Sequence, residues 1–265
     1  MKIQGSVVVI TGGARGIGLA LAKFLASEGA RVVLGDVLGP EVERAAEEIR
    51  AAGGEAFAVA ADVTREADVS RLMDAATERF GGLDVVIANA GIARDGLVLA
   101  RDPESGRVAR TLSADAFRAV VEVNLTGAFL TLAEGARRIA ERGGPGLLVV
   151  ISSINKAGQP GQLNYASAKA AVALWPKILA AEFHWAGFRG LRVVGIAPGY
   201  TGTEALKAMP QPALEGVLKD VPLGRLIEPD ELAATLQLAI ENEAINGTTI
   251  EVSGGASFGP WQRAK

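Results

Sequence analysis

Short apolar runs alternate along the chain with longer segments whose apolar residues recur at helical spacing. The runs are mostly continuous, as in strands that are buried on both faces of a parallel sheet. They lie at residues 6–10, 31–36, 55–60, 84–88, 147–151, 191–197 and 248–252. Helices are predicted after residue 18, over 41–52 and 66–80, from 113 onward, over about 165–186, and from 228. This alternation predicts one α/β domain over residues 1–265, a doubly wound parallel sheet of seven strands with helices on both faces.

Two segments depart from this pattern. Residues 92–112 are irregular and polar, which favours a solvated, charged surface loop over a small hairpin. Residues 200–225 combine prolines with apolar side chains after a Pro-Gly pair that ends a strand. That composition indicates a lid over a pocket.

Composition excludes several classes of protein. Apolar residues make up 49% of the 265 residues and the net charge is -3, so neither disorder nor a nucleic-acid surface is expected. The chain has no cysteine and a single histidine, His184, which excludes disulfides, thiolate catalysis and a histidine-based metal site. No signal peptide and no apolar run of about 18 residues is evident. We therefore expect a cytoplasmic protein that has no metal and no membrane partner.

A glycine-rich loop, residues 11–18, links the first strand to the first helix. Gly12, Gly16 and Gly18 let the backbone turn sharply, and Arg15 and Ile17 lie between them. A diphosphate could approach the helix N-terminus here, where free N–H groups and the helix dipole favour an anion. The strand-then-helix context makes this pattern more specific than its glycines alone.

An acid, Asp36, ends the second strand, 18 residues after Gly18. A carboxylate there accepts hydrogen bonds from both ribose hydroxyls and repels a 2′-phosphate, so NAD(H) is predicted over NADP(H). Arg15 argues the other way, because an arginine in the loop could pair with that phosphate. Gly12, Asp36, Asp62 and Asn89 all follow strands, which places them at one edge of the sheet.

The central chemistry is predicted at Tyr165 and Lys169. Residues four apart share one face of a helix, so the ammonium of Lys169 would lower the pKa of the phenol from its usual value of about 10. A serine from the Ser152-Ser153 pair could hold a carbonyl or alcohol oxygen beside the phenol. The set is built to move a proton on or off an oxygen. Asn124, a polar residue on an apolar helix side, is as consistent with a structural role as with a catalytic one.

Together these features resemble the short-chain dehydrogenase/reductase family, which has a Rossmann-type fold. The resemblance spans about residues 5–256 and keeps the family's order of motifs. The matching residues are Thr11-Gly-Gly-Ala-Arg-Gly-Ile-Gly18, Asp62-Val63, Asn89-Ala90-Gly91, Asn124, Ser153, Tyr165 with Lys169, and Pro198-Gly199 followed by Thr203. It implies an oxidoreductase that interconverts a secondary alcohol and a ketone with NAD(H).

The resemblance also implies a role for each residue. Tyr165 would be the acid/base, Lys169 would lower its pKa and hold the nicotinamide ribose, Ser153 would bind the substrate oxygen, and Asn124 would position a water. The cofactor would be bound by Gly12, Arg15, Gly16, Ile17, Gly18, Asp36, Asp62, Val63, Asn89, Ala90, Gly91, Tyr165, Lys169, Pro198, Gly199, Thr201 and Thr203. A homotetramer or dimer is the family's usual state.

Some alternatives stay open at this point. Ser153 lies one residue closer to Tyr165 than is common in the family, and Ser152 would restore the usual spacing. Residues 154–158 and 162–164 resemble the 3-oxoacyl-[acyl-carrier-protein] reductase branch, which usually uses NADPH, so an acyl-thioester substrate competes with a small apolar alcohol. An epimerase or dehydratase, and a nucleotide-binding module without catalysis, are the remaining classes.

Overall fold

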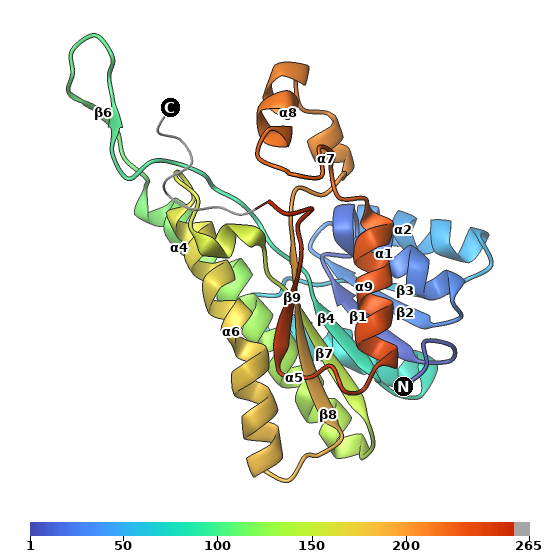
Figure 1. The fold of residues 1–265 in the computed structure, drawn as a ribbon. Helices are drawn as coiled ribbons and strands as arrows, with labels where there is room; N and C mark the ends of the chain where they lie inside the picture. Colours follow the sequence, from blue (N-terminus) through green and yellow to red (C-terminus); the bar gives the residue numbers. More distant parts are fainter. Residues whose placement is uncertain (257–265) are drawn as a thin grey trace.

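The sheet of the computed structural model, which describes residues 1–256, has seven parallel strands (Figure 1). Its order is β3-β2-β1-β4-β7-β8-β9, which confirms the predicted doubly wound sheet. The strands are β1 (Val7–Thr11), β2 (Arg31–Asp36), β3 (Glu55–Ala60), β4 (Val85–Ala88), β7 (Gly146–Ile151), β8 (Leu191–Pro198) and β9 (Thr248–Val252). Successive strands are added on one side of β1 up to β3, and on its other side from β4 onward. Ligands of such folds bind outside the carboxyl ends of the strands at this switch point.

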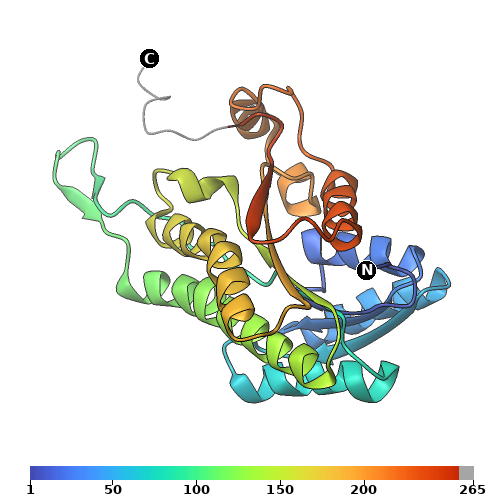
Figure 2. The same ribbon diagram turned by 60° about the horizontal axis from the view of Figure 1, so that its bottom comes forward.

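Helices cover both faces of the sheet, as the continuous apolar strands require (Figure 2). On one face lie α1 (Gly16–Ser27), α2 (Gly39–Ala51) and α9 (Pro229–Glu241), which bury side chains such as Leu21, Val42 and Leu236. The other face is covered by α3 (Glu66–Phe80), α5 (Ala128–Arg142) and α6 (Leu163–Trp185), with Leu72, Leu132 and Val172 in a second core.

The helix predicted from residue 113 is interrupted. Ser113 caps α4 (Ala114–Val121) by accepting a hydrogen bond from the backbone N–H of Ala116, and a π-helical segment, Glu122–Gly127, then joins α4 to α5. Such π-bulges are rare and are frequent at functional sites. Here the bulge contains Asn124.

The stretch Ala114–Arg142 is long and apolar enough, by length and composition, to cross a membrane. This corrects the expectation that the chain contains no such stretch. Its α5 part packs on the sheet and buries Leu132 and Ile139 in the core, so in this fold it is one of the covering helices.

The two irregular segments lie above the strand ends. Residues 92–112 contain a hairpin, the less favoured of the two alternatives, in which β5 (Ala100–Arg101) pairs with β6 (Val108–Arg110) and which projects from the body (Figure 1). The 200–225 segment holds two short helices, α7 (Glu204–Lys207) and α8 (Gln211–Leu218), neither of which has a buried residue. A 3-10 turn, Ile154–Ala157, connects β7 to the loop before α6.

Candidate active site

Two adjoining cavities open at the edge where the strands end. The first, of about 680 Å³, lies over the ends of β1 to β4, and the second, of about 450 Å³, lies between β7, β8, α6 and the 200–225 segment. Ile17, Asn89, Gly91, Ile92 and Thr203 line both, so the cavities form one continuous groove.

The groove gathers most of the residues that the sequence indicated. In the first cavity are Gly12, Arg15, Ile17, Asp36, Asp62, Val63, Asn89, Ala90, Gly91 and Thr203. In the second are Ile17, Asn89, Gly91, Ser153, Tyr165, Lys169, Pro198, Gly199, Thr201 and Thr203. Gly16, Gly18 and Asn124 line neither cavity.

Two glycines of the loop, Gly12 and Gly18, have no room for a side chain. A Cβ on Gly18 would lie 2.2 Å from the carbonyl oxygen of Gly12, and one on Gly12 would lie 2.8 Å from the Cα of Ala90. Gly12 and Gly16 also have φ angles of 67° and 59°, which L side chains rarely adopt. The N-terminus of α1 has no side-chain cap and no acid in its first turn. Its N–H groups are therefore available to an anion in the groove.

The carboxylate of Asp36 is fixed at the end of β2. One oxygen accepts from the backbone N–H of Ala14 at 3.1 Å and the other from that of Leu38 at 3.1 Å. Each oxygen keeps further acceptor capacity toward the first cavity. Arg15 lines the same cavity, so a positive and a negative side chain both face the ligand space there.

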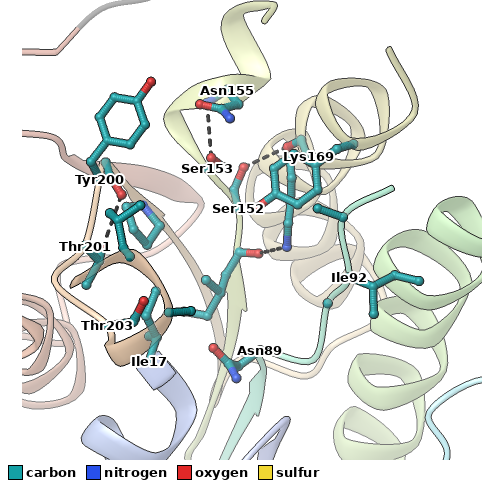
Figure 3. A pocket seen from close by; sticks show the side chains of 18 of the residues that line it. Ile17, Asn89, Ile92, Ser152, Ser153, Asn155, Lys169, Tyr200, Thr201 and Thr203 are labelled. Atoms are coloured by element: carbon teal, nitrogen blue, oxygen red, sulfur yellow. Dashed lines mark hydrogen bonds between the residues drawn. The ribbon is translucent and has the colours of Figure 1, made fainter. Parts of the chain in front are cut away.

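Lys169 is buried on α6, one turn after Tyr165. Its Nζ donates to the backbone oxygen of Ile151 at 2.7 Å, and Figure 3 shows the Lys169 side chain among the lining residues. The same Nζ lies 5.7 Å from the centroid of the Tyr165 ring. Burial lowers the pKa of the Lys169 ammonium from 10.5 to about 8. The charged form is therefore held in a site that penalises it and that would favour additional hydrogen-bond acceptors.

The phenol of Tyr165 is also buried, and burial raises its pKa. A hydrogen bond with Ser153 lowers that pKa, while the negative charge of Asp95 raises it. The expectation that Lys169 lowers the phenol's pKa is not met in this arrangement. Desolvation dominates here, and the lysine Nζ is directed to the carbonyl of Ile151.

The two serines have different partners (Figure 3). The hydroxyl of Ser152 donates to the backbone oxygen of Lys169 at 2.7 Å and is buried. The hydroxyl of Ser153 accepts from the backbone N–H of Asn155 at 3.1 Å, and Ser153 lines the second cavity together with Tyr165. Of the two serines, only Ser153 affects the pKa of the phenol, which it lowers.

Asn124 ties the π-bulge to the loop after β4. Its Oδ1 accepts from the N–H of Ile92 at 2.8 Å, and its Nδ2 donates to the oxygen of the same residue at 2.9 Å. The side chain is 1% exposed. A structural role is therefore visible, and the water-positioning role stays a prediction.

Three further residues support or line the groove beyond the expected site residues. Thr11, at the start of the glycine loop, accepts from the N–H groups of Asn89 and Ala90 and so connects the end of β1 to the end of β4. Asn155 and Gln162 line the second cavity beside Ser153 and Tyr165. Their position in the sequence could have identified them as site residues, because both lie in the short segment between Ser153 and Tyr165.

Comparison with known proteins gives consistent matches. The family model described as short chain dehydrogenase matches residues 6–213. An oxidoreductase of Mycobacterium tuberculosis is 39% identical over 96% of this chain and 97% of its own. The cis-4-hydroxycyclohexanecarboxylate dehydrogenase of Sinomonas cyclohexanicum is 36% identical over 94% and 95%. The structure of 3-ketoacyl-(acyl-carrier-protein) reductase from Brucella melitensis complexed with NADH has 31% identity and a TM-score of 0.80, covering 97% of this chain and 100% of that one.

Proposed function

The chain belongs to the short-chain dehydrogenase family and is an oxidoreductase acting on CH–OH groups; we propose that it uses NAD(H) to interconvert a secondary alcohol and a ketone. The observation that carries the proposal is the second cavity, which Ser153, Tyr165 and Lys169 line together, with Nζ of Lys169 5.7 Å from the centroid of the Tyr165 ring. A proton donor or acceptor for a substrate oxygen is thereby built into the groove.

The groove fits a dinucleotide. The glycine loop and the uncapped start of α1 would hold the diphosphate, Asp36 the adenosine ribose, and Asp62 with Val63 the adenine. The residues proposed for the nicotinamide half are Asn89, Ala90, Gly91, Tyr165, Lys169, Pro198, Gly199, Thr201 and Thr203. When bound, the nicotinamide would supply the hydride chemistry.

Asp36 supports NAD(H) over NADP(H). Its two oxygens are held by backbone N–H groups, so the carboxylate cannot turn away from a ribose without losing both bonds. A 2′-phosphate beside a fixed carboxylate would be repelled. Arg15 is the one residue of the loop that could offset this repulsion, and replacement of Asp36 would leave it unopposed.

The protein's own part in the reaction is to hold the substrate oxygen and to move a proton. Ser153 would bind the oxygen while the phenol of Tyr165 gives a proton during ketone reduction, or takes one as phenolate during alcohol oxidation. Because burial raises the pKa of the phenol, the arrangement favours the protonated form that reduction needs. Lys169 would hold the hydroxyls of the nicotinamide ribose.

We also propose that the enzyme is a homo-oligomer. Phe129 on α5 and Leu174 and Ile178 on α6 are exposed, at 56%, 63% and 49% respectively. These helices cover the same face of the sheet, and a second copy would bury such side chains. Light scattering coupled to size-exclusion chromatography would detect a dimer or tetramer, and a monomer at micromolar concentration would refute the proposal.

The experiment that tests the proposed function is a screen of secondary alcohols, hydroxyacyl thioesters and their ketones, followed by NADH and NADPH absorbance. We expect turnover with NAD(H). Efficient turnover with NADPH and an acyl-carrier-protein thioester alone would instead support the competing reductase activity, for which the similarity to 3-ketoacyl-(acyl-carrier-protein) reductase is the supporting observation.

The acid/base role is tested by Tyr165→Phe. This change should lower kcat about 10²- to 10⁴-fold, the range for a general acid–base group, while NAD binding stays close to normal. Tyr200→Phe, which removes the other phenol of the same cavity, is the matched control and should lower kcat far less. Equal losses in the two variants would contradict the role assigned to Tyr165.

A further inference from the structure

A chain of three polar side chains leads from the protein surface to the wall of the second cavity. Asp95 accepts from Nε2 of Gln162 at 2.8 Å, and Oε1 of Gln162 accepts from Nδ2 of Asn155 at 2.5 Å. Gln162 and Asn155 both line the cavity, together with Ser153 and Tyr165. The chain therefore ends beside the place where the substrate oxygen would be bound.

The carboxylate sets the direction of every bond in this chain. An ionised carboxylate only accepts, so the nitrogen of the Gln162 amide must face Asp95 and its oxygen must face Asn155. The nitrogen of Asn155 must then face Gln162. Asn155 lines the cavity, and no group within residues 1–256 donates a hydrogen bond to its Oδ1, so this oxygen is available as an acceptor. The orientation follows from chemistry, whereas an isolated amide could face either way.

The backbone around Asp95 is anchored. Nδ2 of Asn164, a fully buried residue, donates to the oxygen of Arg94 at 3.0 Å, and the N–H of Gly96 donates to the oxygen of Gly161 at 2.7 Å. These bonds connect Arg94 to the first turn of α6 and Gly96 to the loop before that helix. The backbone of Asp95 is therefore held in place, so that its carboxylate can orient the amide of Gln162 although the side chain is exposed.

Resting on the proposed function, we propose that the substrate is a secondary alcohol or ketone that carries a further hydroxyl group, which donates a hydrogen bond to Oδ1 of Asn155. Asp95 is then the positioning residue, because it fixes the orientation of the two amides that keeps this oxygen directed at the cavity. A substrate without a donor at that position would leave the amide oxygen without its partner. Sites built to bond a polar group discriminate against analogues that lack it. The acceptor thus narrows the substrate class from alcohols in general to hydroxylated ones.

The test compares kcat/KM for cyclohexanol with that for the cyclohexane-1,2-, 1,3- and 1,4-diols, with NAD as oxidant. We expect the best diol to exceed cyclohexanol about tenfold, as one hydrogen bond of ordinary net strength allows. In Asp95→Asn both amide orientations become possible, so the ratio should fall to within about twofold of unity. Activity on cyclohexanol itself should change far less than the ratio.

Two further variants separate positioning from other effects. Glu104→Gln removes a negative charge from the same excursion without touching the chain of amides, and should keep the ratio. Gln162→Leu breaks the chain in the middle and should lose the ratio as Asp95→Asn does. Asp95 also raises the pKa of Tyr165, but that effect acts on all the alcohols alike and cancels in the ratio.

The proposal and the proposed function can fail separately. Absence of turnover with every alcohol and thioester would refute the proposed function. Calorimetric titration of the Tyr165→Phe variant with NAD and the same alcohols gives the affinity ratio without turnover. An affinity ratio near unity, or one that Asp95→Asn leaves unchanged, would refute the inference about the substrate's hydroxyl.

Discussion

Replacement of Lys169 by methionine should make the folded protein more stable at neutral pH while it removes activity. The ammonium has an ordinary pKa of 10.5 and one of about 8 in the folded protein, because it is buried. That difference corresponds to about 3 kcal/mol of destabilisation when the group is charged. Methionine avoids this penalty but loses the bond to the carbonyl of Ile151, which costs about 1 kcal/mol. The variant should therefore be about 2 kcal/mol more stable than the wild type at pH 7.

The sign of the effect should reverse with pH. Below pH 8 both the folded and the unfolded wild type carry the charge, so the penalty is fully present. Between about 8 and 10.5 the unfolded state binds more protons than the folded state, so the wild type gains stability as the pH rises. Above that window the penalty is gone, and the variant should be less stable by about the 1 kcal/mol of the lost hydrogen bond.

Urea unfolding of the two proteins at intervals from pH 7 to pH 10 measures the difference directly. Other titrating groups contribute equally to both proteins and cancel. Lys177→Met, on the exposed side of the same helix, is the control and should show little change with pH. A difference for Lys169→Met that stays constant over this range would refute the claim that the buried charge destabilises the fold.

Three further changes test the groove. Asp36→Ala should relax the preference for NAD, seen as a lower ratio of kcat/KM for NAD over NADP; a wild type that already favours NADP would contradict the role of this carboxylate. Ser153→Ala should lower kcat far more than Ser152→Ala, whereas Ser152→Ala should mainly lower the melting temperature, because its hydroxyl is buried and bonded to the backbone of α6; the reverse ranking in the two assays would exchange the roles. Gly18→Ala places a Cβ 2.2 Å from the oxygen of Gly12, so calorimetry should show at least tenfold weaker NAD binding. Unchanged affinity would mean that the loop can move to accommodate the methyl group without losing the cofactor.

The strands could be predicted closely because their signal is local. A parallel strand covered on both faces must be apolar along its whole length, and runs such as 31–36 and 55–60 match the observed strands residue for residue. The glycine loop could be placed for the same reason, since its strand and helix are adjacent in the sequence. The short helices of the 200–225 segment bury no side chain and so leave no periodic pattern to detect.

The features that escaped prediction depend on contacts between distant residues. The π-bulge at Asn124 is held by the backbone of Ile92, and Gln162 is oriented by Asp95, 67 residues earlier in the chain. Neither pairing is visible in local spacing. The pKa of Tyr165 was predicted in the wrong direction because sequence gives the neighbour Lys169 but does not give the burial, which has the larger effect.

The choice between the two serines shows what the sheet adds to the motif. Both serines line the second cavity, but successive side chains at a strand end point in opposite directions, so their hydroxyls meet different partners. The register of β7 on β8 decides which: Ile151 pairs with Ile196, and the N–H of Ser152 donates to the oxygen of Ile196 at 2.8 Å. With that register Ser152 bonds α6 and Ser153 meets the phenol. Counting residues back from the tyrosine cannot decide this, because a loop can lose a residue without moving the strand, whereas a shift of the strand by one residue would exchange the two hydroxyls.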